Sequence, residues 1–209
     1  MAADVAVHTP PPPILRPLPD QLLGPRVLLR PPRAGDGPAV WEAVEESRPE
    51  LRLWMPWADK HGSPDDSEAH ARRAQAQWLL REDLPISVWE KDPGLYLGGS
   101  GLHRINWEVP SFEIGYWLRT SAQGKGFMTE AVSLLCRLAL ETLAAQRVEI
   151  RCDARNVRSA ALPRRLGFVH EATLRNAART PQGELRDTLI FALTPTDYMP
   201  RHGNLSEGV

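Results

Sequence analysis

The stretch Gln123-Gly124-Lys125-Gly126-Phe127-Met128-Thr129-Glu130-Ala131 is the part of the sequence from which the fold can be inferred. Glycine adopts positive φ freely, so two glycines around a lysine allow the backbone to turn its N–H groups inward. A helical pattern begins directly behind them, and a helix start has unpaired amides and a partial positive charge. The stretch therefore predicts a binding turn for an anion, and a phosphate or pyrophosphate is the expected ligand.

The segments on either side place this turn between two strands. Residues 111–118 alternate, with Glu113, Gly115 and Trp117 on one face and Phe112, Ile114, Tyr116 and Leu118 on the other. Residues 127–141 carry one narrow polar stripe, which is typical of a helix that is largely buried against a sheet. Residues 147–152 alternate again, so the predicted order is strand, glycine-rich turn, helix, strand.

Three phosphate-binding designs share this order, and the spacing of their glycines separates them. A Walker loop requires Gly-x-x-x-x-Gly-Lys-Ser/Thr, which this stretch lacks. A dinucleotide-binding fold requires a third glycine where Thr129 stands, and its first glycine follows the strand almost directly. Here residues 119–123 intervene, so both designs are disfavoured.

The third design fits the residues. Gln123-x-x-Gly126-x-Met128 resembles the Q/R-x-x-G-x-G/A pyrophosphate loop of the GNAT acyltransferase superfamily. Residues 113–118, Asn156-x-x-Ser159 and Leu166-Gly167-Phe168 extend the resemblance to the RimJ/RimL-like branch, over roughly residues 25–195. Met128 departs from the pattern, because Gly or Ala is commoner there. Its side chain would either crowd the phosphates or point into the helix packing.

The pattern of elements and the resemblance together predict the domain organisation. We expect one α+β domain of GNAT fold at residues 25–196, with a mixed, mostly antiparallel sheet of six to seven strands and about four helices. A proline-rich arm, residues 1–24, precedes it, and a polar tail, residues 197–209, follows it. The resemblance implies that the sheet splays open beside residues 111–118, where a pantetheine arm would enter.

The resemblance also implies an activity. The expected enzyme moves an acetyl or other short acyl group from coenzyme A to a primary amine by direct attack on the thioester. The acceptor amine remains open between a small molecule and a protein N-terminus, and RimL-like proteins commonly pair as homodimers. A non-catalytic acyl-CoA-binding sensor or scaffold is the alternative.

Acetyl-CoA is thus the expected cofactor, and the family pattern assigns its contacts to three segments. These are the strand, the glycine-rich turn and the start of the last helix, with residues Tyr116, Trp117, Leu118, Gln123, Gly124, Lys125, Gly126, Phe127, Met128, Thr129, Asn156 and Ser159. Asn156 is also expected to cap the helix, and Ser159 to assist the departing thiolate.

Acyl transfer to an amine needs a base, because an ammonium group has no lone pair with which to attack. Glu113 is the first candidate, since it shares a face with Gly115, whose missing side chain leaves room for a ligand. A solvated surface carboxylate is the other interpretation of Glu113. Some RimL-like proteins use a later glutamate, but Ala178 stands in that place here, which leaves Glu113, His103 or a bound water.

Aromatic residues in predicted loops indicate the acceptor side. Trp54 and Trp57 flank Met55-Pro56 in a loop that overlies the acceptor channel in the resembling branch, and His103 ends the neighbouring strand. We expect all three, Trp54, Trp57 and His103, to bind substrate. Together with Trp107, the two loop tryptophans would expose a large apolar surface on a monomer, so they also favour a homodimer, a covering by the arm or an acceptor.

Composition excludes several other classes of function. The formal net charge of −1 gives no electrostatic support to nucleic-acid binding. Cys136 and Cys152 are predicted buried thiols, without the spacing of a disulfide framework or a metal site. The sequence shows no apolar run long enough for a membrane span and no basic-then-apolar leader, so a cytoplasmic location is expected.

Overall fold

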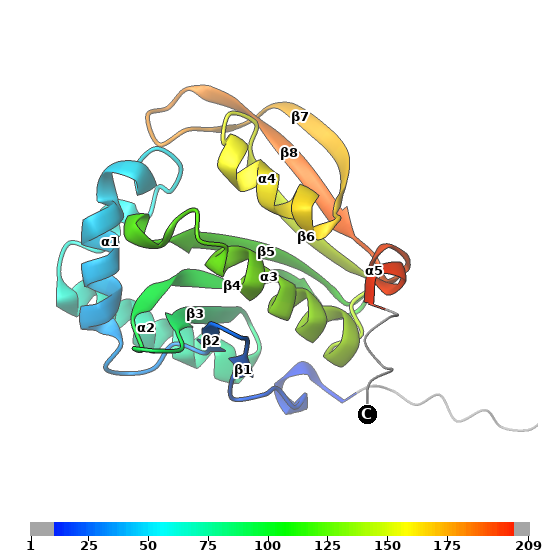
Figure 1. Cartoon of the computed structure of the whole chain (residues 1–209), viewed down its shortest axis with the longest axis horizontal. Coiled ribbons are helices and arrows are strands. Elements are labelled where there is room, and N and C mark those ends of the chain that lie inside the picture. The colour runs from blue at the N-terminus through cyan, green and yellow to red at the C-terminus, as the bar shows by residue number, and fades with distance from the viewer. Residues whose placement is uncertain (1–10, 203–209) are drawn as a thin grey trace, which may run out of the picture.

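A single twisted sheet organises the chain in the computed structural model, which describes residues 11–202 (Figure 1). Its strand order is β1-β2-β3-β4-β5-β6-β8-β7, and every neighbouring pair is antiparallel except β5 and β6. The strands are β1 (Leu22–Leu23), β2 (Val27–Arg30), β3 (Leu84–Glu90), β4 (Tyr96–Asn106), β5 (Ser111–Leu118), β6 (Arg147–Asp153), β7 (Val169–Arg179) and β8 (Leu185–Leu193).

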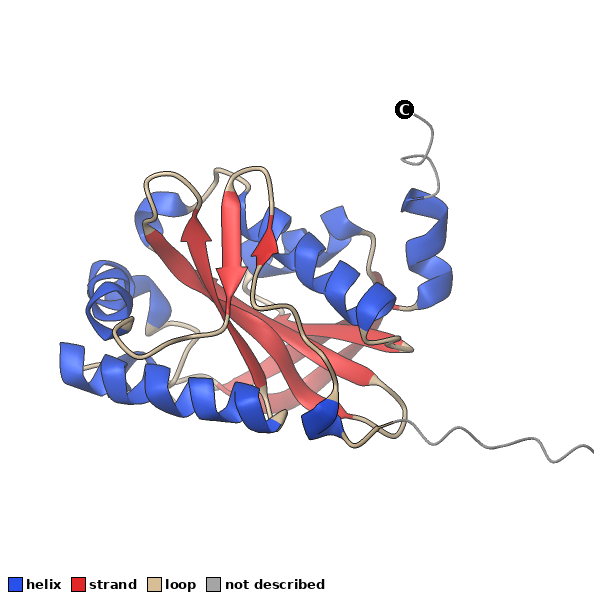
Figure 2. Ribbon diagram, turned by 90° about the horizontal axis from the view of Figure 1, so that it is seen from below, coloured by secondary structure: helices blue, strands red, loops and turns tan. Residues whose placement is uncertain are grey.

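Helices lie on both faces of this sheet (Figure 2). They are α1 (Gly37–Leu51), α2 (Pro64–Leu80), α3 (Phe127–Arg137), α4 (Val157–Leu166) and α5 (Pro195–His202), and a π-helical turn, Leu138–Thr142, continues α3. α1 packs against α2 and β4, whereas α3 packs against β2, β4 and β5. The mixed, mostly antiparallel α+β fold that the sequence predicts is therefore confirmed.

The element counts differ from those expected. The described part of the chain has eight strands rather than six or seven, because β1 adds a two-residue pair beside β2, too short to give a periodic pattern. It has five α-helices rather than about four. The extra helix, α5, begins two residues before the expected tail and continues into it. At its start, Asp197 Oδ2 accepts from Thr194 N at 3.0 Å and from Thr194 Oγ1 at 2.7 Å. Such a cap, followed by Pro195, is a helix-start pattern.

Residues 11–24 of the expected arm lie along the domain. Pro13–Leu15 forms a short 3₁₀ turn, and Leu18 and Leu22 pack against the main core. The Arg16 guanidinium lies over the Trp107 ring, with its carbon 4.7 Å from the ring centroid. The arm therefore covers Trp107, which is one of the alternatives that the sequence leaves open for the loop tryptophans. Residues 1–10 of the arm, and 203–209 of the tail, lie outside the described residues.

Strand alternation and helix periodicity explain the core. Phe112 and Ile114 are buried on one face of β5, and α3 buries Met128 beside them in the same cluster. The Met128 side chain therefore points into the helix packing, one of the two outcomes expected for it. Cys136 and Cys152 are free and buried, as predicted, and burial raises the pKa of the Cys136 thiol to about 12.

The sheet opens between β5 and β6. Their parallel pairing covers only Ser111–Glu113 of β5 and Arg147–Glu149 of β6. Beyond Glu113, β6 continues to pair with β8, while β5 continues to pair with β4. On the β6 side, the backbone of Gly115–Leu118 thus faces an opening rather than a strand, which is the splay that the sequence resemblance implies.

One further property concerns the helices alone. Within residues 11–202, none of them combines the length and the apolar character that a membrane span requires.

Candidate active site

The glycine-rich turn, residues 123–129, has the backbone geometry expected of an anion site. Gly124 and Gly126 have φ of 75° and 84°, and Gly126 is the N-cap of α3. The first-turn amides of Phe127, Met128 and Thr129 donate to no other group among the described residues. Amides that are unpaired at a helix start and reinforced by the helix dipole fit the diphosphate of coenzyme A.

Three arginines that sequence reasoning missed surround the turn. Arg26 donates from Nη1 to the Lys125 carbonyl at 2.9 Å. Two others come from α4, seven residues apart and hence on one helix face. Arg158 Nη1 donates to the Gln123 side chain at 3.1 Å, and Arg165 Nη1 donates to Thr129 Oγ1 at 3.1 Å. These guanidinium groups increase the positive potential around the turn.

Helix α1 holds the segment that leads into the turn. Arg119 is buried at the end of β5 and donates from Nε to Glu46 at 2.8 Å. The other Glu46 oxygen accepts from Ser121 N at 2.7 Å, and Ser47 Oγ accepts from Thr120 N at 2.9 Å. Although burial opposes it, the Arg119 guanidinium lowers the pKa of Glu46, which stays ionised. The turn is therefore positioned by a charged, hydrogen-bonded support.

The splay brings Tyr116 and the start of α4 together. Asn156 caps α4 as expected, because its Oδ1 accepts from Ser159 N at 3.0 Å. The Tyr116 hydroxyl donates to the Ser159 carbonyl at 2.9 Å and accepts from Ser159 Oγ at 3.2 Å. Burial raises the pKa of Tyr116, so this phenol keeps its proton at neutral pH. Two hydroxyl groups thus lie side by side at the splay.

A cavity of about 490 Å³ lies between α2 and strands β3, β4 and β5, and we call it the α2 cavity. Trp57 and Trp117 line it, with ring centroids 5.6 Å apart, next to Met55. Gly115 and Tyr116 also line it, so the cavity adjoins the β5 side of the splay. Of the two expected acceptor tryptophans, Trp57 is in the cavity wall, whereas Trp54 is half-buried outside it.

A histidine and an aspartate face each other in this cavity. His103 Nδ1 lies 2.9 Å from both carboxylate oxygens of Asp83, and both residues line the α2 cavity. The carboxylate fixes the tautomer in which Nδ1 carries the proton, so Nε2 presents a lone pair. Asp83 was not singled out from the sequence. The signal was the hairpin register, in which Leu84 pairs with Leu102 and Asp83 therefore stands opposite His103.

The glycines of β4 and β5 make room for side chains of the protein. A Cβ at Gly101 would lie 2.7 Å from His103 Nε2, and one at Gly115 would lie 3.4 Å from His103 Cδ2. A Cβ at Gly99 would lie 2.7 Å from Trp117 Nε1. The room above Gly115, which the sequence assigned to a ligand, is therefore shared with the His103 imidazole. The reason is that this ring leans along the strand over both glycines.

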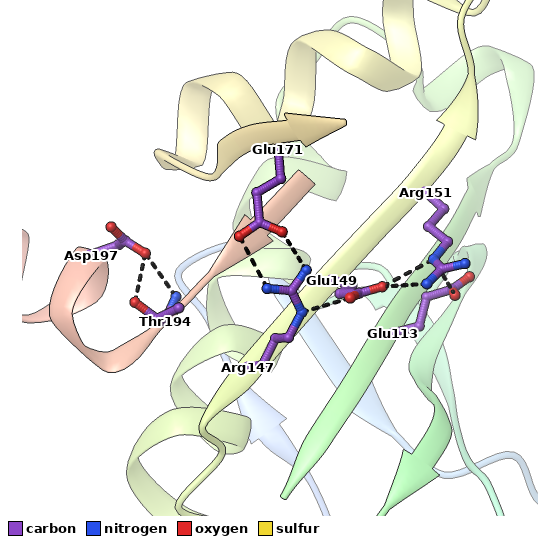
Figure 3. A network of polar contacts seen from close by, with 7 residues as sticks. All are labelled: Glu113, Arg147, Glu149, Arg151, Glu171, Thr194 and Asp197. Carbon is purple, nitrogen blue, oxygen red and sulfur yellow. Dashed lines mark hydrogen bonds and ion pairs between the residues drawn. The ribbon is translucent and has the colours of Figure 1, made fainter. Parts of the chain in front are cut away.

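Glu113 pairs with His103 across β4 and β5, which places both side chains on the same face. Glu113 nevertheless does not line the α2 cavity. Its Oε2 lies 3.3 Å from Arg104 Nε and 3.4 Å from Arg151 Nε. Figure 3 shows the Arg151 side of this network, which continues along β6 through Glu149. Two guanidinium groups therefore hold the Glu113 carboxylate outside the α2 cavity.

His61, also in the cavity wall, gives the fold a pH dependence. Its ring is buried and Nδ1 lies 2.9 Å from Ser67 Oγ. Burial, followed by the charges of His70 and Arg48, lowers the pKa of His61 to about 4. The unfolded chain binds a proton at His61 more tightly than the folded chain does. The neutral ring therefore contributes fully to the stability of the fold above about pH 6.5, and this contribution is lost as pH falls towards 4.

We expect His61→Asn to lower the dependence of stability on pH. Between pH 7 and 4 the wild type should lose about 3 kcal/mol more unfolding free energy than the variant. Urea denaturation at several pH values measures this difference. His170→Asn, on the exposed strand β7, is the control and should keep the wild-type slope. An unchanged slope in His61→Asn would contradict the assignment.

Comparison with known proteins identifies the family. The family model described as "Acetyltransferase (GNAT) domain" matches residues 26–169. YdaF of Bacillus subtilis (strain 168), provisionally named a ribosomal N-acetyltransferase, is 28% identical over 168 residues, which are 78% of this chain and 88% of YdaF.

Solved structures share the fold. The microcin C7 self-immunity acetyltransferase MccE, in complex with acetyl-CoA and AMP, superposes with a TM-score of 0.77 at 22% identity, over 82% of this chain and 93% of MccE. RimL, the ribosomal L7/L12 α-N-protein acetyltransferase, in complex with coenzyme A, gives 0.74 at 22% identity, over 82% of this chain and 95% of RimL.

The family match includes β2 to the start of β7 and so spans both the glycine-rich turn and the splay. It supports the catalytic interpretation over a non-catalytic sensor. The chain belongs to the GNAT acetyltransferase family and is an acetyl-CoA-dependent N-acetyltransferase.

Proposed function

We propose that the acceptor amine binds in the α2 cavity and loses its proton to His103 Nε2. The observation that carries this proposal is the His103–Asp83 pair, with 2.9 Å between Nδ1 and either carboxylate oxygen, in the wall of a cavity that adjoins the splay. Glu113 is a weaker candidate, because two arginines hold its carboxylate outside the cavity. Asp83 acts through His103 and is a positioning residue.

Each residue then has one task in the transfer. Bound acetyl-CoA supplies the thioester carbon, and its sulfur leaves as the new N–C bond forms and the C–S bond breaks. His103 takes the amine proton, and Asp83 stabilises the imidazolium that results. We assign to the Ser159 hydroxyl, which donates to the Tyr116 hydroxyl at 3.2 Å, a hydrogen bond to the departing sulfur once acetyl-CoA is bound.

The proposed contacts with acetyl-CoA lie at the glycine-rich turn and at the splay. The amides of Phe127, Met128 and Thr129 would bind the diphosphate, with Gly124 and Gly126 providing the turn. Gln123 and Lys125 complete the turn, Asn156 lies beside the splay, and the backbone of Tyr116, Trp117 and Leu118 would pair with the pantetheine amides. The side chain of Met128 is buried, so only its amide is available.

For the acceptor we propose the N-terminal amine of a protein. A relative named for ribosomal N-acetyltransfer supports this choice, and a cavity of about 490 Å³ can hold the first residues of a peptide. The test is release of free thiol from acetyl-CoA with a panel of N-terminal peptides, lysine side-chain analogues and small amines. Turnover confined to N-terminal amines supports the proposal, and turnover confined to small amines contradicts it.

We further propose a cytoplasmic homodimer that pairs through the edge strand β7. This strand ends the sheet, and Val169 and Leu174 on it, with Leu185 on β8, are exposed apolar side chains. An unpaired edge with apolar side chains favours a two-fold pairing with a second copy. Dependence on acetyl-CoA and two free thiols support a cytoplasmic location.

Light scattering at micromolar concentration tests whether the chain forms a dimer. The wild type should show about twice the chain mass of 23.3 kDa. Leu174→Lys combined with Val169→Lys should give the single-chain mass, because the added charges repel across a two-fold axis. A monomeric wild type would contradict the dimer.

A further inference from the structure

Helix α2 presents two different stripes of side chains. Its buried stripe consists of Ser67, Ala71, Ala74 and Trp78, which pack beneath the helix. A second stripe, spaced three or four residues apart, borders the α2 cavity with Asp66, His70, Arg73 and Gln77. Ala71 and Ala74 of the buried stripe also reach the cavity, so its polar lining on α2 comes from the second stripe, which can distinguish one acceptor from another.

The acidic and the basic side chains that line the cavity differ in whether they have partners. Its carboxylates have partners: Asp83 contacts His103, and Asp66 Oδ2 accepts from the Ser63 hydroxyl at 2.8 Å. Its cationic side chains, Lys60 Nζ and the Arg73 guanidinium, have no ion pair or hydrogen bond with any residue among 11–202. The cavity wall therefore carries two positive charges without a partner in this part of the chain.

Lys60 and Arg73 are exposed at the rim of the cavity, and the neighbouring histidines add no charge to them. Burial and then the Arg73 charge lower the pKa of His70, and the same charge contributes to the low pKa of His61. Both rings are neutral at pH 7 and add no further charge. Arg72, the adjacent residue on α2, faces away and pairs with Glu68 at 2.7 Å. The two arginines thus differ in what they face and in that only Arg72 has an ion-pair partner.

We propose that the acceptor carries an anionic group, a carboxylate or a phosphate, that binds Arg73 and Lys60 while its amine reaches His103. This inference rests on the proposed function, in which the amine enters the α2 cavity. A guanidinium binds such groups through paired N–H donors, and a partly enclosed cavity strengthens the contact. The tryptophan wall, Trp57 and Trp117, would pack against the apolar part between the two groups.

The test compares acceptors that differ only in charge. Tetrapeptide amides with Glu or Gln at the second, third or fourth residue form one arm. Small amines with and without a carboxylate or phosphate form the other, so the two arms separate a peptide source from a free acid. We expect the wild type to prefer at least one acidic member by about 10- to 100-fold in kcat/KM, mainly through KM.

Single substitutions on α2 test which side chain causes the preference for acidic acceptors. Arg73→Gln should remove it and Arg73→Glu should reverse it, while the KM for acetyl-CoA stays unchanged. Arg72→Gln, the same change outside the cavity, should keep it. Turnover of acidic and neutral acceptors at equal rates would overturn this inference alone, and so would a preference that survives Arg73→Glu. Absence of turnover with every amine, in a wild type that binds acetyl-CoA, would overturn the proposed function and this inference with it.

Discussion

Gly126→Asp should abolish measurable binding of acetyl-CoA. Gly126 is the N-cap of α3 at φ 84°, a conformation that disfavours a side chain, and a Cβ there would lie 3.3 Å from Arg26 Nη2. The new carboxylate would also stand where the first-turn amides of α3 would bind the diphosphate. Backbone strain and charge repulsion act in the same direction, so titration calorimetry should detect no binding at the wild-type range of concentrations.

Two further variants, both at glycines with positive φ, separate the effect of charge at the turn from that of backbone strain. Gly124→Asp adds the same charge to the turn at a position where a Cβ would meet nothing within 4 Å, and it should weaken binding strongly. Gly94→Asp is the control, because Gly94 has a similar φ of 85° and an equally open surrounding in the β3–β4 turn. It should bind acetyl-CoA normally. Normal affinity in folded Gly124→Asp and Gly126→Asp would refute the placement of the diphosphate.

His103→Gln should reduce turnover by about 100- to 10,000-fold, the range for loss of a general base. Acetyl-CoA affinity should change little, because His103 lies in the α2 cavity rather than at the glycine-rich turn. The deficit should shrink as pH rises, since more of the amine is then already deprotonated. Initial rates from pH 6 to 10, with saturating acetyl-CoA, measure both effects.

Asp83→Asn and Glu113→Gln test the assignment of His103 as the general base. Asp83→Asn keeps the shape but removes the carboxylate that fixes the His103 tautomer, so it should lower kcat and alter the pH profile. Glu113→Gln removes the carboxylate between Arg104 and Arg151 and should leave kcat within a few-fold of the wild type. A large loss in Glu113→Gln together with wild-type kinetics in His103→Gln would transfer the base to Glu113.

Local sequence patterns predicted much of this structure. Alternation in residues 111–118 predicted β5 and its buried face, and the glycines before a helical run predicted the αL turn at the start of α3. Asn156 as the cap of α4 followed from residue type alone. These features depend on contacts within a few residues, which a sequence displays directly. The α5 cap at Thr194 and Asp197 was equally local but was outweighed by the polar composition of the tail.

The features that escaped prediction depend on pairing between distant segments. Asp83 lies 20 residues from His103, and only the β3–β4 register brings them together. The neighbours of Glu113 could not be inferred either, because Arg151 comes from β6 across the parallel pair. The contact of Arg16 with the Trp107 ring likewise joins two segments that are far apart in the sequence. The direction that a side chain takes within its face could not be predicted either, since the His103 ring leans over Gly115.

In the proposed reaction the thioester of acetyl-CoA meets the acceptor at His103, in the cavity between α2 and the sheet. A crystal structure of the complex with coenzyme A would show whether the groups are arranged in this way. The diphosphate should contact the amides of Phe127–Thr129, and the thiol should lie beside the Ser159 hydroxyl, with His103 Nε2 facing it across the α2 cavity. A thiol that emerges on the opposite face of β5, or one that faces Glu113 with His103 shielded from it, would contradict the account.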